Sequence, residues 1–207
     1  MSIIVIGGQS RSVGKTSVVA GLIARLPELR WTAFKITQYG HGFCTADGKP
    51  CQCQTADSCV SVTTAREATS GTDTARFLAA GAVRSLWVRT RIGMLSEAVP
   101  RIQDELARSE NAILESNSIL DYLEPDLYLT VLDPSIADFK DSARRFLDRA
   151  DAILWSSPDE QTVLPRDHLR TRFHGKPQFA IGPPDYISRD ALEFVRARLA
   201  AKTPALR

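Results

Sequence analysis

The chain has 207 residues, of which 43% are hydrophobic and 24% charged, and its formal net charge is +2. This composition is ordinary for a globular protein, and the length suits one α/β domain with a continuous core. The nearly balanced charge gives no electrostatic basis for binding nucleic acid or an anionic membrane, so we expect neither partner.

The N-terminus, MSIIVIGGQS, lacks the basic segment and the long apolar segment of a secretory signal peptide. No stretch of the sequence approaches the roughly 18 apolar residues that span a bilayer. We therefore expect a cytoplasmic protein, and disulfide bonds are rarely kept in that compartment.

The first predicted elements are two strands separated by a helix. Residues 3–6 form a short β-branched run before Gly7-Gly8, which predicts a buried parallel strand. A second strand is predicted over residues 31–36. The helix between them covers residues 15–25, and its predicted inner face carries Val18, Val19, Leu22 and Ile23.

Periodicity is lost between residues 38 and 66, where Gly, Pro, Asp and Cys accumulate, and a loop this long is usually functional. The rest alternates between predicted helices and strands. The helices are 73–81, 95–108, 139–149 and 188–201, and the strands are 85–89, 112–114, 127–132, 152–155 and 178–181. This alternation predicts a three-layer α/β fold, in which helices cover both faces of a mainly parallel sheet. One domain over 1–207, with a cysteine-rich insertion at about 38–66, is the simplest organisation.

Residues 8–16, GQSRSVGKT, lie between the first predicted strand and the first helix. A glycine-rich turn at this place directs backbone N–H groups toward an anion at the positive end of the helix. A lysine there reaches the terminal phosphates, and a threonine hydroxyl coordinates Mg²⁺. We therefore predict that ATP or GTP binds with Mg²⁺ to Gly8, Ser12, Val13, Gly14, Lys15, Thr16 and Ser17, and that Lys15 is also catalytic.

The spacing of this loop is unusual. Five residues separate Gly8 from Gly14, where the standard phosphate loop has four, and Gln9 takes the usual position of a glycine. The alternative is a chance Gly-Lys-Thr at the start of a helix. The preceding strand, the double glycine and the apolar helix that follows all argue against chance.

The loop resembles the Gly-x5-Gly-Lys-Thr loop of dethiobiotin synthetase and its relatives. Residues 32–37, TAFKIT, resemble the second strand of the molybdopterin-guanine dinucleotide biosynthesis protein B family. Residues 71–76, GTDTAR, followed by 80–82, AGA, are similar to that family's Gly-x-Asp-x-x-Arg helix and Ala-Gly-Ala. The chain departs from both families after Glu115, where Ser116-Asn117-Ser118 replaces the usual glycine.

This resemblance implies a P-loop NTPase that hydrolyses ATP or GTP slowly. It implies an accessory role in molybdopterin-type cofactor biosynthesis, with a cofactor-biosynthesis protein as partner and a homodimer as one possible assembly. The alternative that the resemblance leaves open is an ATP-dependent ligase or kinase that acts on a small carboxylic acid. The motif that reads guanine in GTPases, Asn-Lys-x-Asp, does not follow the late strand at 152–155, so the choice between ATP and GTP stays open.

Three further residues complete the predicted site. Glu115 follows an apolar strand, where a carboxylate assists Mg²⁺ binding, although it could instead cap the following turn. Asp73 begins a predicted helix and is either a second Mg²⁺ ligand or an N-cap. Lys35 ends the second strand, where it could neutralise charge in phosphoryl transfer or lie in solvent, and we predict a catalytic role for it.

All four cysteines of the chain fall within sixteen positions. Four thiolates suit a tetrahedral Zn²⁺ site or an iron–sulfur cluster, and His41 could replace one thiol. The alternative is a set of reduced surface thiols. We predict a metal, with zinc ahead of iron–sulfur because no other signal indicates redox chemistry, bound by Cys44, Cys51, Cys53 and Cys59.

Overall fold

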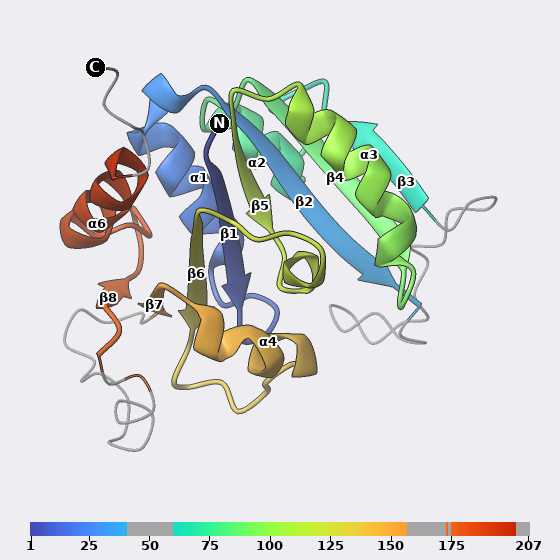
Figure 1. Cartoon of the computed structure of the whole chain (residues 1–207). Helices are drawn as coiled ribbons and strands as arrows, with labels where there is room; N and C mark the ends of the chain where they lie inside the picture. The colour runs from blue at the N-terminus through green and yellow to red at the C-terminus, as the bar shows by residue number, and fades with distance from the viewer. Residues whose placement is uncertain (41–59, 157–172, 174, 202–207) are drawn as a thin grey trace.

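The computed structural model of the chain describes residues 1–40, 60–156, 173 and 175–201. In this part of the chain eight strands form one sheet in the order β3-β4-β2-β5-β1-β6-β7-β8 (Figure 1). All neighbouring strands are parallel except β3 and β4. The strands are β1 Ile3–Gly8, β2 Trp31–Tyr39, β3 Val60–Thr64, β4 Arg84–Arg91, β5 Asn111–Glu115, β6 Leu127–Leu132, β7 Ala152–Ser156 and β8 Gln178–Ile181.

Helices cover both faces of the sheet, which confirms the predicted three-layer α/β architecture (Figure 1). One face packs against α1 (Lys15–Arg25), α2 (Asp73–Ala79) and α6 (Arg189–Ala200). The opposite face packs against α3 (Leu95–Ala107) and α4 (Asp141–Phe146). Short 3₁₀ helices complete the described chain at η1 (Pro27–Leu29), η2 (Ser118–Asp121) and η3 (Leu147–Arg149).

The central strands are buried on both faces, which explains their continuous apolar sequences. Along β1, Ile4 and Ile6 join the core beneath α1, whereas Val5 joins the core beneath α3. All three side chains are fully buried. A strand covered on both faces needs apolar residues at every position rather than at alternate ones.

The strand order brings three predicted site segments to one edge of the sheet. Strand β5 lies between β1 and β2, and Glu115 at its end is aligned with Ile6 of β1 and with Lys35 of β2. Because parallel strands end at the same edge, the carboxyl ends of all three meet where the loop after β1 begins.

Two predicted boundaries were wrong. The predicted loop at 38–66 overlaps the end of β2, which continues to Tyr39, and contains the whole of β3. Strand β3 has the sequence VSVTT and pairs antiparallel with β4 at the edge of the sheet, so its stability depends on a distant partner. The helix predicted over 139–149 is a shorter α4 followed by a 3₁₀ turn. No helix in the described ranges has the length and apolar character that crossing a bilayer requires.

Candidate phosphate-binding site

The loop between β1 and α1 contains two residues with left-handed backbone conformation. Ser12 and Gly14 adopt left-handed backbone angles, with φ of 59° and 98°. A Cβ on Gly14 would also lie 3.3 Å from the ring of Tyr186. A Cβ on Gly8 would lie 2.9 Å from the Cγ and Cδ atoms of Lys15, so a glycine at position 8 lets the lysine stem cross the end of the strand. The loop therefore requires glycine at both positions.

The ammonium group of Lys15 turns back over the loop and donates a hydrogen bond to the Ser10 carbonyl. Burial lowers the pKa of Lys15 to about 8. The negative charge of Glu115 opposes this shift, whereas the positive charges of Lys140 and Lys35 add to it. Lys15 thus lies in a partly desolvated and cation-rich environment, which a polyanion would stabilise.

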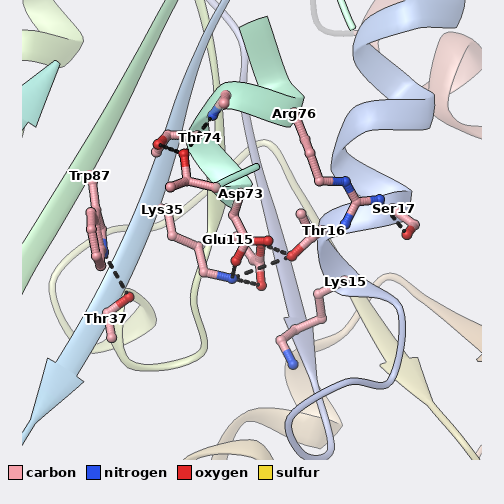
Figure 2. Close-up of polar contacts among 12 residues, drawn as sticks. Lys15, Thr16, Ser17, Lys35, Thr37, Asp73, Thr74, Arg76, Trp87 and Glu115 are labelled. Atoms are coloured by element: carbon pink, nitrogen blue, oxygen red, sulfur yellow. Dashed lines mark hydrogen bonds and ion pairs between the residues drawn. The ribbon is translucent and has the colours of Figure 1, made fainter. Parts of the chain in front are cut away.

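Four side chains from four elements converge beside Lys15 (Figure 2). The Thr16 hydroxyl donates a hydrogen bond of 2.9 Å to Glu115 Oε2, and Glu115 is only 3% exposed. The ammonium group of Lys35 lies 2.5 Å from Glu115 Oε1, 2.8 Å from Asp73 Oδ2 and 3.4 Å from Thr16 Oγ1. The structure therefore brings together the predicted residues Thr16, Lys35, Asp73 and Glu115.

This cluster also fixes the charge of Lys35. Burial lowers the pKa of Lys35, but Glu115 and Asp73 raise it by a larger amount, so the pKa lies above its ordinary value. The same hydroxyl and two carboxylates are hard oxygen donors of the kind that Mg²⁺ prefers. Thr16, Glu115 and Asp73 could therefore hold Mg²⁺ beside the loop.

Helix α2 contributes to the site from its first turn. Its N-cap is Thr72, whose hydroxyl accepts a hydrogen bond of 3.2 Å from the Ala75 N–H. Thr72 rather than Asp73 therefore caps the helix, and the Asp73 carboxylate pairs with Lys35 instead. One turn further, the Arg76 guanidinium donates a hydrogen bond of 3.0 Å to the Ser17 hydroxyl and so ties α2 to α1.

Asn117 is a site residue whose role the sequence did not indicate. Its side-chain oxygen accepts a hydrogen bond of 2.9 Å from the Gly8 N–H, and its amide donates one of 2.9 Å to the Gly8 carbonyl. Strand β5 ends at Glu115, so the Asn117 side chain replaces the backbone partner that Gly8 would otherwise have there. A Cβ on Gly7 would lie 2.3 Å from Asn117 Oδ1, which explains the double glycine.

The four predicted metal-binding cysteines, Cys44, Cys51, Cys53 and Cys59, and the neighbouring His41 lie outside the described residues. Within the described ranges, no group of three or more His, Cys, Asp and Glu side chains is placed to hold a metal ion. The predicted zinc or iron–sulfur site therefore stays a prediction from sequence.

A separate cavity of about 290 Å³ opens at the same edge of the sheet, between the end of β2, η2 and α4. Its charged lining includes the exposed Arg145, whose guanidinium forms an ion pair of 2.6 Å with Asp121. Its polar and apolar lining also includes Gln38, Ser118, Tyr122, Asp141, Ser142 and Phe146.

No protein-family model matches the sequence, and no curated protein matches it. Several solved structures are similar to it. LpxK from Aquifex aeolicus, in complex with ATP, is 20% identical with a TM-score of 0.50; the match covers 87% of this chain and 53% of LpxK. HypB from Helicobacter pylori, in complex with nickel, is 16% identical with a TM-score of 0.50, and the match covers 96% of this chain and 86% of HypB. MobB from Bacillus subtilis is 14% identical with a TM-score of 0.44, over 96% of this chain and 98% of MobB.

LpxK and HypB are P-loop NTPases, and the chain has their fold. The predicted resemblance to P-loop NTPases is thus confirmed at the level of architecture. At identities this low the likeness establishes the fold and not the activity. The chain spans about half the length of LpxK.

Proposed function

We propose that this chain binds ATP or GTP together with Mg²⁺ and hydrolyses the terminal phosphoanhydride slowly. The observation that carries the proposal is the convergence of Thr16, Glu115, Asp73 and Lys35 beside the phosphate loop (Figure 2). A fold shared with P-loop NTPases and a lysine with a lowered pKa in the same loop support it.

In this proposal different residues bind the phosphates, bind Mg²⁺ and stabilise the transferred phosphoryl group. The backbone N–H groups of residues 12–16 and the Lys15 ammonium bind the phosphate oxygens. Thr16, Glu115 and Asp73 hold Mg²⁺, which when bound withdraws charge from the phosphate oxygens as a Lewis acid. Lys35, kept protonated by its two carboxylate partners, is positioned to stabilise charge on the transferred phosphoryl group.

The first proposed role is that of an accessory factor in molybdopterin-type cofactor biosynthesis, acting with a cofactor-biosynthesis protein. The sequence resemblance described above supports this role. The proposed metal site in the cysteine-rich segment would then lie just beyond β2, which carries Lys35. HypB, a structure of the same fold, was solved with nickel, which is a precedent for metal binding in a protein of this fold.

The second candidate is phosphoryl transfer to a small acceptor, and the 290 Å³ cavity favours it. Gln38 in its lining follows Lys35 by three residues on β2, and Ser118 follows Glu115 by three residues after β5. At about 3.3 Å per extended residue, the Gln38 backbone lies roughly 10 Å along β2 from that of Lys35. An acceptor bound there could be oriented toward the terminal phosphate.

The test is nucleotide binding by calorimetry and turnover by phosphate release, with ATP and GTP in parallel. Lys15→Ala should abolish measurable binding, because it removes the cation that faces the phosphates. The matched control is Arg101→Ala, which removes an exposed cation from α3. Full affinity and turnover in Lys15→Ala would refute the proposal. Turnover that rises only with a small acceptor would favour transfer over hydrolysis.

A further inference from the structure

The segment between β6 and α4 lies directly on the phosphate loop, because three of the four polar groups of Gln9 bond to it and the fourth bonds to the end of β6. The Gln9 N–H donates to the Val131 carbonyl at 3.0 Å, and the Gln9 carbonyl accepts from the Lys140 N–H at 2.9 Å. The side-chain oxygen accepts from the Asp133 N–H at 2.9 Å, and the side-chain amide donates to the Ile136 carbonyl at 2.5 Å. Gln9 is only 4% exposed, so these bonds form in a largely dry environment and fix the segment firmly.

Lys140 is the last residue of this segment, and its backbone is thereby held against the loop. Its side chain is half-buried. Burial lowers the pKa of Lys140, the positive charges of Arg11 and Lys35 lower it further, and Asp138 and Glu115 partly oppose the shift. Among the described residues, its ammonium group has no hydrogen-bond or ion-pair partner.

The positive charges of Lys15, Lys35 and Lys140 therefore act on one another around the phosphate loop. The positive charge of Lys140 lowers the pKa of Lys15, and the positive charge of Lys35 lowers the pKa of Lys140. Two of the nearby carboxylates, Asp73 and Glu115, are already paired with Lys35, and the third, Asp138, is exposed to solvent. Bringing like charges together costs free energy unless an anion lies among them. An anion with several negative charges, placed on the loop, would resolve this repulsion.

We infer that Lys140 contacts the terminal phosphate of the bound nucleoside triphosphate and stabilises the charge that develops there during hydrolysis. The inference rests on the proposed function. The terminal phosphate is favoured because the Lys140 backbone is bonded to Gln9, next to Gly8, where the Lys15 stem crosses the end of β1. The lysine of a phosphate loop reaches the terminal phosphates. Lys140 thus supplies a cation from beyond β6, whereas Lys15 and Lys35 supply cations from α1 and β2. Gln9 is the positioning residue that holds the backbone of Lys140 in place.

The test compares Lys140→Met, Lys140→Gln and Lys140→Arg with the wild type, using ATP and GTP, their diphosphates and their β,γ-imido analogues. The two uncharged variants should lower kcat by about tenfold to a hundredfold. They should also lower the preference for the triphosphate analogue over the diphosphate about tenfold, because only the triphosphate carries the group that Lys140 contacts. Lys140→Arg should restore most of both losses. If the role of Lys140 were purely structural, the uncharged variants would weaken diphosphate and triphosphate binding equally. Lys140→Arg would then restore neither affinity.

Two matched variants complete the design. Arg144→Met removes a neighbouring exposed cation of α4 and should change neither kcat nor the triphosphate preference. Gln9→Ala removes the two side-chain bonds that hold the segment, so it should lower the triphosphate preference in the same direction as Lys140→Met. In the double variant the loss should not exceed that of Lys140→Met by more than twofold, because both changes act through one contact.

The inference would be overturned by a kcat and a triphosphate preference within twofold of wild type in both uncharged variants. An equal loss of diphosphate and triphosphate binding without rescue by Lys140→Arg would overturn it as well. Failure of the proposed function can be distinguished from failure of this inference. If the proposed function fails, Lys15→Ala keeps its nucleotide affinity. With Lys15→Ala inactive and Lys140→Met unchanged, the nucleotide site stands and the role of Lys140 is refuted.

Discussion

The Asn117→Ala substitution tests how the base of the phosphate loop is held. Asn117 satisfies both the N–H and the carbonyl of Gly8, with two hydrogen bonds of 2.9 Å, and Gly8 is buried. Leaving a buried polar group without a partner costs about 1–3 kcal/mol. With two such groups, and with water able to enter the space that the half-buried Asn117 leaves, we expect a loss of about 2–4 kcal/mol in the free energy of unfolding.

Urea unfolding followed by circular dichroism measures this loss, and a melting curve should show a fall of roughly 2–4 °C per kcal/mol. Nucleotide affinity should fall by about tenfold as well, equivalent to about 1.4 kcal/mol, because a mobile Gly8 no longer supports the Lys15 stem. Asn117→Asp should not rescue the protein, since its second oxygen faces the Gly8 carbonyl and cannot donate.

The chain offers a matched control at the opposite end of β5. Asn111 also makes two hydrogen bonds, accepting one of 2.7 Å from the Ser2 N–H and donating one of 2.7 Å to the Leu29 carbonyl. Asn111→Ala should therefore destabilise the protein by a similar amount and leave nucleotide affinity unchanged. A loss below 0.5 kcal/mol in Asn117→Ala, or equal effects of the two variants on affinity, would refute the reasoning.

Three other predictions concern the charges and the metals of the candidate site. Phosphate binding favours protonated Lys15, whose pKa is about 8 in the free protein, so nucleotide affinity should be constant below that pH. It should fall above that pH by up to about tenfold per pH unit, and a calorimetric series in which the wild-type affinity stays constant above that pH would contradict this. Glu115→Gln removes a predicted Mg²⁺ ligand, so the Mg²⁺ concentration for half-maximal hydrolysis should rise about tenfold or more; an unchanged requirement would exclude Glu115 as a ligand. Cys53→Ser should lower the zinc or iron content found by elemental analysis and leave nucleotide binding intact, and a wild-type protein without metal would remove the proposed cysteine site.

Much of the candidate site could be predicted because its chemistry is local in sequence. The phosphate loop is contiguous from Gly8 to Ser17, and the strand before it and the helix after it have clear periodic patterns. Lys35 and Glu115 were placed near it by one general rule, that parallel strands end at the same edge of a sheet. The register of β2 against β5 then aligns these two residues directly.

The contacts that could not be predicted are those whose partners are distant in sequence. Asn117 and Gly8 are separated by 109 positions, and the sequence showed only that a family glycine was missing near Asn117. Strand β3 was predicted as loop because its five residues, two of them polar and exposed, are too few to indicate a strand without β4 beside them. Propensity in such an edge strand is weak compared with the contribution of its neighbour.

Gln9 departs from the standard phosphate loop, and the Ser116-Asn117-Ser118 run departs from the families that the sequence resembles. These two departures have a common physical cause. Successive peptide groups of an extended strand point to opposite sides, so the backbone of Gly8 faces β5 while that of Gln9 faces β6. Asn117 bonds Gly8 from the β5 side, and the segment from Val131 to Lys140 bonds Gln9 from the β6 side. The base of the loop is therefore fixed on both sides, whereas Arg11 and Ser12 at its tip stay exposed. A side chain at position 9 is tolerated because it replaces the flexibility of glycine with two bonds to the segment that follows β6 and ends at Lys140.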